Sequence, residues 1–329
     1  MSEAGDYDPG HWRGYDFKSA RKTYDKHVSR SYSDARVSRG GKSVSVKDCV
    51  PAEVKTESTS PLVIAIDVTG SMGDWPATIF SKLPYLDLEG KEYLGEDMEI
   101  SFAAVGDYFS DEYPLQVQPF CTGKGLEKTL KKLIIEQGGG GTTQESYELA
   151  ATYYAHNTSM DEAVRPIFIF IGDEGFYDWV DKEASKDWAH VSGKQRVSGA
   201  VAIKNLKKKF SVYIVRKPYS MSRINSRSST DERIHKQWVE ALGEDHVVEL
   251  PDASRVVDVI FGILAKETGR VDYFEGELKD RQDPDQVSVV MDSLVTVHTA
   301  SVKKLPENVS LTRRKKGSKT PGKSVSLLD

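Results

Sequence analysis

Three short oxygen-bearing side chains stand on alternate residues where an apolar segment of the chain ends. Leu62 to Ile66 is wholly apolar, and Asp67-Val68-Thr69-Gly70-Ser71 follows it directly. Carboxylate and hydroxyl oxygens suit Mg²⁺, which usually keeps several waters and accepts only a few protein ligands. Because Gly70 gives the loop backbone freedom, we expect the three polar side chains to turn toward one point and form part of a magnesium site.

Two further segments carry suitable oxygen donors. Ile167 to Ile171 is a second wholly apolar run, and it is followed by Gly172-Asp173. The carboxyl ends of parallel strands lie at one edge of a sheet, so Asp173 is expected near the first loop. Gly138 to Gly141 precedes Thr142 and Thr143, and such a glycine loop lets a hydroxyl approach a site that bulkier residues would block.

Taken together, these three segments resemble a von Willebrand factor A domain over roughly residues 61–269. The resemblance implies a mainly parallel sheet with helices on both faces and a metal-ion-dependent adhesion site at its carboxyl edge. Thr69 stands where that family usually has Ser, and it keeps the hydroxyl. Thr143 remains an alternative to its neighbour as the second-loop ligand. The ligands implied for one Mg²⁺ or Mn²⁺ are Asp67, Thr69, Ser71, Thr142 and Asp173.

Each of these residues also has a purely structural interpretation. Thr142 and Glu145 have the spacing of a capping box, which would start a helix. Asp67 and Asp173 are of a type that is common in turns and at helix starts. Asp107, after Val105-Gly106, is a candidate for orienting a metal-bound water, or an ordinary turn aspartate. Only the agreement of three separate loops favours the metal interpretation.

The resemblance implies a binding module without chemistry of its own, in which a partner's Asp or Glu completes the metal shell. Phe176, Tyr177 and Trp179 follow the third loop and are candidates for contact with that partner, because aromatic residues are enriched at interfaces. The alternative is that Phe176 or Trp179 packs beneath the next helix.

An enzyme, such as a metal-dependent phosphohydrolase, is the alternative function. Thr69 occupies the second position of the Asp-x-Asp start that aspartyl-phosphate chemistry needs, and Gly123-Lys124-Gly125 does not form a phosphate-binding loop. No Ser/His/Asp or Cys/His set can be named either. We therefore expect no enzymatic activity.

The sequence pattern around these residues predicts an α/β protein with a doubly wound, mainly parallel central sheet and helices on both faces. Apolar runs separated by amphipathic stretches of helical length are typical of that class. Helices are expected around Leu126 to Ile134, Ile234 to Leu242 and Val256 to Leu264. The expected strands are Leu62 to Ile66, Ile100 to Val105, Leu115 to Phe120, Ile167 to Ile171, Val212 to Val215 and Val247 to Leu250.

The two ends of the chain differ from this central domain. Residues 1–60 are polar and basic and predict a mobile arm, since they hold too few aliphatic residues to offset the entropy of ordering. Residues 270–329 form an extension with possible short strands at 287–297 and a basic, disordered tail from 303. That tail predicts an acidic partner or nucleic acid, bound through salt-dependent attraction.

Charge and composition restrict further what kind of protein this chain can be. The first 50 residues carry 10 Lys and Arg against 7 Asp and Glu, and residues 301–329 carry 8 against 2, which leaves an excess of 14 acidic groups between them. No apolar run approaches the roughly 18 residues that a membrane-spanning helix needs, and the first residues lack a signal-peptide pattern. The two cysteines lie far apart without metal-ligand spacing, which predicts reduced thiols. We expect a soluble, cytoplasmic protein that does not contact a membrane.

Overall fold

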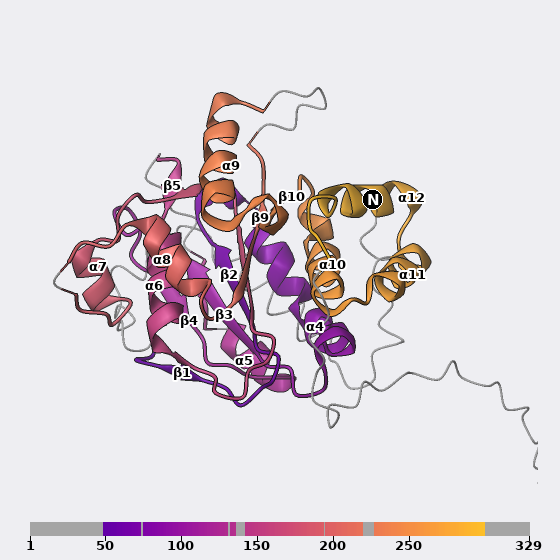
Figure 1. Cartoon of the computed structure of the whole chain (residues 1–329), viewed down its shortest axis with the longest axis horizontal. Helices are drawn as coiled ribbons and strands as arrows, with labels where there is room; N and C mark the ends of the chain where they lie inside the picture. The colour runs from indigo at the N-terminus through magenta and orange to yellow at the C-terminus, as the bar shows by residue number, and fades with distance from the viewer. Residues whose placement is uncertain are drawn as a thin grey trace, which may run out of the picture.

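The computed structural model describes residues 49–73, 75–130, 132–135, 142–193, 195–219 and 227–299 (Figure 1). The first 48 residues of the expected arm, the glycines of the second loop and the basic tail from 303 lie outside the described residues. Within the described part, no helix is both long enough and apolar enough to cross a membrane. Cys49 and Cys121 are both free thiols.

A six-stranded sheet forms the centre of the protein, as the apolar runs predict. Its strand order is β10-β9-β7-β2-β3-β4, and every pair is parallel except β3 with β4, which is antiparallel. The fold is therefore a doubly wound α/β sheet. The strands are β2 (Leu62–Asp67), β3 (Ile100–Val105), β4 (Leu115–Val117), β7 (Ile167–Gly172), β9 (Ser211–Arg216) and β10 (Val247–Glu249).

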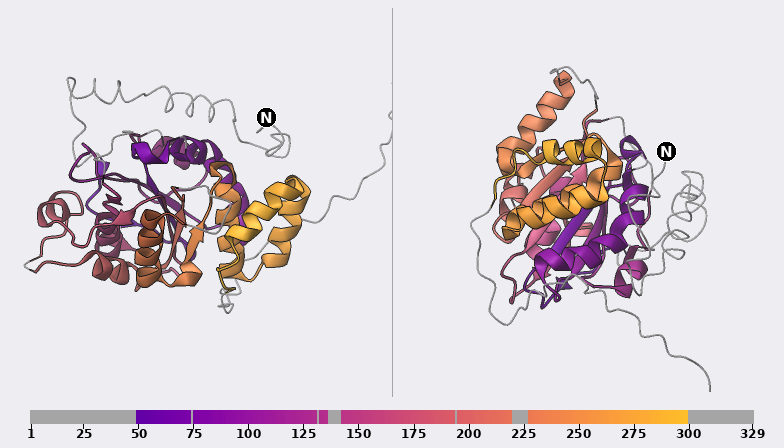
Figure 2. Two further views of the ribbon diagram at one scale, coloured as in Figure 1. Left: turned by 90° about the horizontal axis from the view of Figure 1, so that it is seen from above. Right: turned by 90° about the vertical axis from the view of Figure 1, so that its right-hand side faces the viewer.

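Both faces of this sheet are covered by helices, as the two views of Figure 2 show. Alternate residues of β2 enter different cores: Leu62, Ile64 and Ile66 pack on one face, and Val63 and Ala65 on the other. This explains why the strand is apolar throughout, since a strand buried on both faces has no solvent side. One face carries α4 (Trp75–Leu94) and α10 (Val256–Thr268), and the other α6 (Tyr147–Asn157), α8 (Gly199–Leu206) and α9 (Ser229–Leu242).

Short elements complete the structure. α5 (Lys124–Leu130) contacts α4, and α7 (Lys182–Asp187) contacts α6. Single turns of 3₁₀ helix follow β2, α9 and β10: η2 (Gly70–Met72), η3 (Glu244–His246) and η4 (Ala253–Arg255). Two small parallel sheets pair β1 (Val54–Lys55) with β6 (Thr158–Ser159), and β5 (Gln144–Glu145) with β8 (Gly175–Phe176).

The last part of the expected N-terminal arm is packed onto the body. Val50 and Val54 are buried in the same core as α6 and α8. Further along, the hydroxyl of Thr56 donates to Glu99 Oε2 at 2.6 Å. The folded domain therefore begins before residue 61, because Val50 and Val54 enter the core and β1 pairs with β6.

The prediction of short strands at 287–297 is wrong, because this segment is helical. α11 (Val271–Arg281) is followed by α12 (Pro284–Ser293), and both contact α10. Asp283 and Gln286 form a capping box at the start of α12, and Pro284 occupies its first turn. Val287, Val290, Met291 and Leu294 repeat at helical spacing and pack against the core. Valines at short spacing suggested a strand, but the cap and this stripe decided the helix.

A substitution at Leu294 tests how firmly this helical extension packs against α10. Its side chain is buried and would collide with any Cβ at Gly262 of α10. Leu294→Ala should lower the free energy of unfolding by about 2–5 kcal/mol, because it leaves a cavity between α10 and α12. Denaturant unfolding measures this, with Val295→Ala as the control, since Val295 is 77% exposed. Equal stability of the two variants would contradict the docking.

Candidate metal site

Asp67 occupies the last position of β2 and is fully buried at the carboxyl edge of the sheet. Its Oδ1 accepts hydrogen bonds from the backbone N–H of Thr69 at 2.9 Å and from the Thr69 hydroxyl at 2.6 Å. Its Oδ2 accepts one from the Tyr147 hydroxyl of α6 at 2.8 Å. The side chain thus shapes the turn and also ties the end of β2 to α6.

Asp173 follows β7, the strand that pairs with β2, and it faces the first loop. The Ser71 hydroxyl donates to Asp173 Oδ1 at 3.0 Å and lies 3.2 Å from the Thr69 hydroxyl. The structure therefore brings together four of the five predicted ligands through a continuous chain of oxygen contacts. Asp173 Oδ2 is buried and has no hydrogen-bond partner among the described residues.

Gly172 makes this close approach possible. A Cβ at this position would lie 1.7 Å from the Tyr147 hydroxyl oxygen and 3.2 Å from Cβ of Asp67. Any larger residue would therefore displace Tyr147, which holds one oxygen of Asp67. The Gly-Asp pair in the sequence reflects two needs: a bare backbone beside the tyrosine and a carboxylate directly after it.

It is electrostatically unfavourable for both carboxyl groups to carry a negative charge at this buried site. Burial raises the pKa of Asp67, and the nearby charge of Asp173 raises it further. Burial also raises the pKa of Asp173, although Lys217 and Ser71 partly offset that rise. Two like charges in a buried site favour either protonation or a bound cation.

Lys217 is a site residue that the sequence pattern did not reveal. It follows β9, whose Arg216 pairs with Gly172 of β7, so it stands beside Asp173 at the same edge. Its Nζ lies 3.7 Å from Asp173 Oδ2 and donates to the backbone carbonyl of Ser71. The signal was available, since Lys217 lies just beyond the predicted strand Val212 to Val215. Only the strand order, however, places that strand next to β7.

Thr142 and Thr143, the described part of the second predicted loop, form hydrogen bonds with residues other than the four clustered ligands. Thr142 is exposed, and its hydroxyl donates to the backbone carbonyl of Gln144 at 2.9 Å. Thr143 accepts a hydrogen bond from Arg233 of α9. The capping-box interpretation also fails, because α6 begins at Tyr147 with Ser146 as its N-cap. The hydrogen bonds of both threonines thus lead away from Asp67 and Asp173, and the glycines before them lie outside the described residues.

A second buried carboxyl pair lies behind the site and was also missed. Glu145 of β5 and Glu174, next to Asp173, are 3% and 4% exposed. Burial raises the pKa of Glu145, and the charges of Asp67 and Glu174 raise it further. The Tyr219 hydroxyl donates to Glu174 Oε1 at 2.5 Å. Burial also raises the pKa of Glu174, so both carboxyls favour the neutral form more than exposed glutamates do.

Asp107 behaves mainly as a turn residue, with one link toward the site. Its Oδ1 accepts from the backbone N–H of Phe109 at 3.1 Å and from the Tyr177 hydroxyl at 2.9 Å. The ring centroids of Phe109 and Tyr177 lie 5.0 Å apart in an edge-to-face arrangement. Phe109 was not predicted and is 65% exposed. Asp107 therefore holds an aromatic cluster next to the loop that carries Thr142.

The predicted aromatic contacts divide between core and surface. Phe176 is buried, with its ring centroid 5.0 Å from that of Trp238. Trp179 is 45% exposed, and Arg196 lies 4.3 Å from its ring centroid. Phe176 is therefore a core residue packed against α9, whereas Tyr177 is partly buried and Trp179 is exposed.

The residues present fit a hard divalent cation. Two buried carboxylates and two hydroxyls converge, and Asp173 Oδ2 accepts no hydrogen bond among the described residues, with Lys217 Nζ 3.7 Å away. Among the described residues, no three His, Cys, Asp or Glu side chains gather to hold a metal. Such a gathering is not required here, because Mg²⁺ accepts one or two carboxylates and fills its remaining positions with hydroxyls and water.

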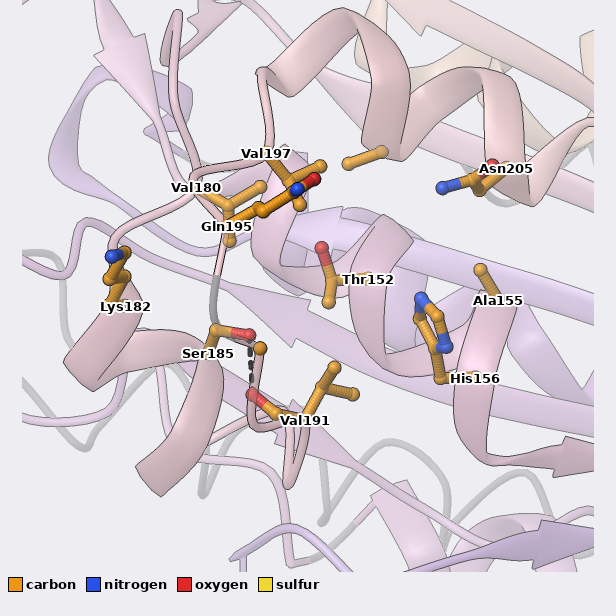
Figure 3. A pocket seen from close by; sticks show the side chains of 12 residues that line it. Thr152, Ala155, His156, Val180, Lys182, Ser185, Val191, Gln195, Val197 and Asn205 are labelled. Atoms are coloured by element: carbon orange, nitrogen blue, oxygen red, sulfur yellow. Dashed lines mark hydrogen bonds between the residues drawn. The ribbon is translucent and has the colours of Figure 1, made fainter.

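A small cavity between α6, α7 and α8 is separate from this cluster (Figure 3). Its volume is about 70 Å³, and its lining includes Thr152, His156 and Ser185. Figure 3 shows one hydrogen bond across it, from the Ser185 hydroxyl to the Val191 carbonyl. Small-molecule sites usually measure roughly 300–1,000 Å³, so the polar edge of the sheet remains the better candidate.

Comparisons with known proteins add little to this geometry. No family model matches the chain, and no curated protein matches it. Among solved structures, the pilus adhesin SpaC from Lactobacillus rhamnosus GG aligns with TM-score 0.45 and 11% identity, covering 68% of this chain and 31% of SpaC. Proximal thread matrix protein 1 from the mussel byssus aligns with TM-score 0.43 and 9% identity, covering 64% of this chain and 48% of that protein. The chain thus spans less than half the length of either.

Buried carboxyl groups make the metal-free stability depend on pH. Burial raises the pKa of Asp67, Asp173 and Glu148, the last to about 8. The folded protein therefore binds more protons than the unfolded chain above the ordinary carboxyl pKa, so stability falls as the pH rises through that window. In EDTA, the free energy of unfolding should decline from about pH 5 to about pH 8. Denaturant titrations at each pH measure it.

Asp67→Asn is the matched variant for this measurement. It keeps the shape of the side chain but removes one of the titrating groups, so its decline with pH should be shallower. A wild-type protein whose stability rises across the same range would contradict the assignment.

Proposed function

We propose that this chain contains a von Willebrand factor A domain whose metal-ion-dependent adhesion site binds Mg²⁺ or Mn²⁺ and, through it, a carboxylate of a protein partner. The observation that supports this most is the meeting of Asp67 and Asp173 at the ends of neighbouring parallel strands, connected through the hydroxyls of Thr69 and Ser71. A binding role without catalysis is part of the proposal.

The chain's own residues divide the work at this site. Asp67 and Asp173 would hold the cation, with Thr69 and Ser71 as hydroxyl ligands. Tyr147 fixes the orientation of Asp67 through its 2.8 Å hydrogen bond. When bound, the cation supplies an open coordination position for an oxygen of the partner. Thr142 completes the proposed ligand set, and its hydroxyl donates to the backbone carbonyl of Gln144.

The surface beside the site suits a protein partner. Tyr108, Phe109 and Tyr177 form a run of edge-to-face rings, with neighbouring centroids 5.4 Å and 5.0 Å apart. Aromatic residues that combine exposure with fixed orientation contribute strongly to interfaces. A partner that offers an Asp or Glu to the metal could therefore bury Phe109 at the same time. The basic tail, outside the described residues, remains a candidate for an acidic partner or nucleic acid.

Metal binding can be tested before any partner is known. Wild-type protein should melt at a higher temperature in Mg²⁺ than in EDTA, and Asp67→Ala should melt at the same temperature in both. At about 100 times the dissociation constant, a ligand adds roughly 2.7 kcal/mol of stability. Asp280→Ala is the control, since it removes an exposed carboxylate on α11. Identical wild-type melting in Mg²⁺, Mn²⁺ and EDTA would sink the proposal.

Lys217 should oppose the cation that Asp173 attracts, because its ammonium group already lies 3.7 Å from that carboxylate. Lys217→Met should raise Mg²⁺ affinity roughly five- to tenfold. Two unit charges at this distance interact with an energy of about 1 kcal/mol even in water, and the substitution removes the repulsion between the ammonium group and the cation. It should also lower stability in EDTA. Calorimetric titration with Mg²⁺ measures the affinity, and Lys217→Arg, which keeps the charge, should resemble wild type. Equal affinities of the Met and Arg variants would contradict this role.

A further inference from the structure

A cavity of about 390 Å³ opens at the opposite edge of the sheet from the candidate metal site. It lies where β7 and β9 begin, between the end of α8, η3 and the end of α10. Its volume falls within the range of small-molecule sites. It is lined by Val164, Arg165, Pro166, Lys207, Lys208, Lys209, Phe210, Ser211, Tyr213, Asp245, His246, Glu267 and His298.

Positive charge dominates this lining. Arg165 and the run Lys207 to Lys209 supply four cations, whereas Asp245 and Glu267 are its two carboxylates. The two histidines add further hydrogen-bonding groups. This excess stands out because the middle of the chain is acidic overall. A concave, cationic site in an acidic body attracts anions selectively.

The three lysines are engaged by neutral oxygens. Lys209 Nζ donates to the Thr158 carbonyl at 2.9 Å, and Lys208 Nζ to Asn205 Oδ1 at 2.8 Å. Lys207 Nζ donates to the Leu242 carbonyl at 2.8 Å. No ion pair within 4.0 Å joins them to a carboxylate in the described part of the chain. Burial lowers the pKa of Lys209, as expected for a cation without a nearby anion.

The two carboxylates of the lining have partners of their own. Glu267 Oε1 accepts from the Tyr213 hydroxyl at 2.7 Å. Asp245 Oδ2 lies 3.7 Å from His246 Nε2 and 3.9 Å from His298 Nδ1. No carboxylate among the described residues neutralises the three lysines, so an incoming anion would meet uncompensated charge, and the excess of two positive charges in the lining matches a phosphate dianion.

One wall of the cavity is apolar. Val164 and Pro166 precede β7, and Phe210, just before β9, is buried. A ligand that was only an inorganic ion would leave this wall uncovered. We propose that the cavity binds a small phosphate-bearing organic molecule, with its phosphate on the lysines and its carbon skeleton against this wall.

Calorimetric titration of the full chain with phenyl phosphate, inorganic phosphate and benzyl alcohol tests this proposal. Phenyl phosphate should bind more tightly than inorganic phosphate, because its ring buries apolar surface, and benzyl alcohol should not bind. Lys208→Glu should weaken phenyl phosphate binding at least about tenfold, since it replaces a charge-assisted contact with repulsion. Lys209→Met should weaken it as well.

Two control variants show whether phenyl phosphate binds in this cavity or elsewhere on the protein. Lys204→Glu makes the same charge change on α8 outside the cavity and should leave the affinity unchanged. Asp280→Ala, which removes an exposed carboxylate on α11 outside the cavity, should also leave it unchanged. Absence of phenyl phosphate binding at millimolar concentration, or equal losses in the Lys204 and Lys208 variants, would overturn the proposal.

Discussion

The burial of two carboxylates within one shell of hydroxyls is the constraint on which the site depends. Asp67 and Asp173 stand at the ends of neighbouring strands, and burial raises the pKa of both. Like charges at such a place are unfavourable unless protons or a cation compensate them. Tyr147 supports one carboxylate and Lys217 the other, so much of the surrounding structure serves to keep them together.

The sheet explains why these groups can be held so close. Strands β2 and β7 pair in parallel from Leu62 with Ile167 onward, and both are buried on two faces. Their ends therefore coincide, and Gly172 leaves room for the tyrosine between the strands and α6. A rigid frame of this kind fixes ligand oxygens more firmly than loops alone could.

The two edges of the sheet offer different chemistry. The carboxyl edge gathers acidic groups and exposed aromatic rings, which suits a cation and a protein surface. The opposite edge gathers lysines around a cavity, which suits an anion. Because the polar ends of parallel strands collect at these two edges while the faces are covered by helices, an α/β sheet can carry two sites that do not interfere. The helical extension of α11 and α12 packs against α10 on one face of the sheet.

The sequence by itself determined the sheet strands, the helices α9 and α10, and the cluster of Asp67, Thr69, Ser71 and Asp173, whereas α4 and α8 were not predicted. Those predictions rest on local patterns: buried strands appear as apolar runs, and their ends are marked by the first polar residue. Local patterns failed at 287–297, where the capping box of Asp283 and Gln286 outweighs the strand-like valines.

Only the tertiary structure decided which strand lies beside which. Strand order places Lys217 beside Asp173, and the pairing of β5 with β8 brings Glu145 near Glu174. It also places the lysines after α8 around a cavity at the start of β7. These neighbours come from segments tens of residues apart, and no local pattern of residues specifies a contact made across the sheet.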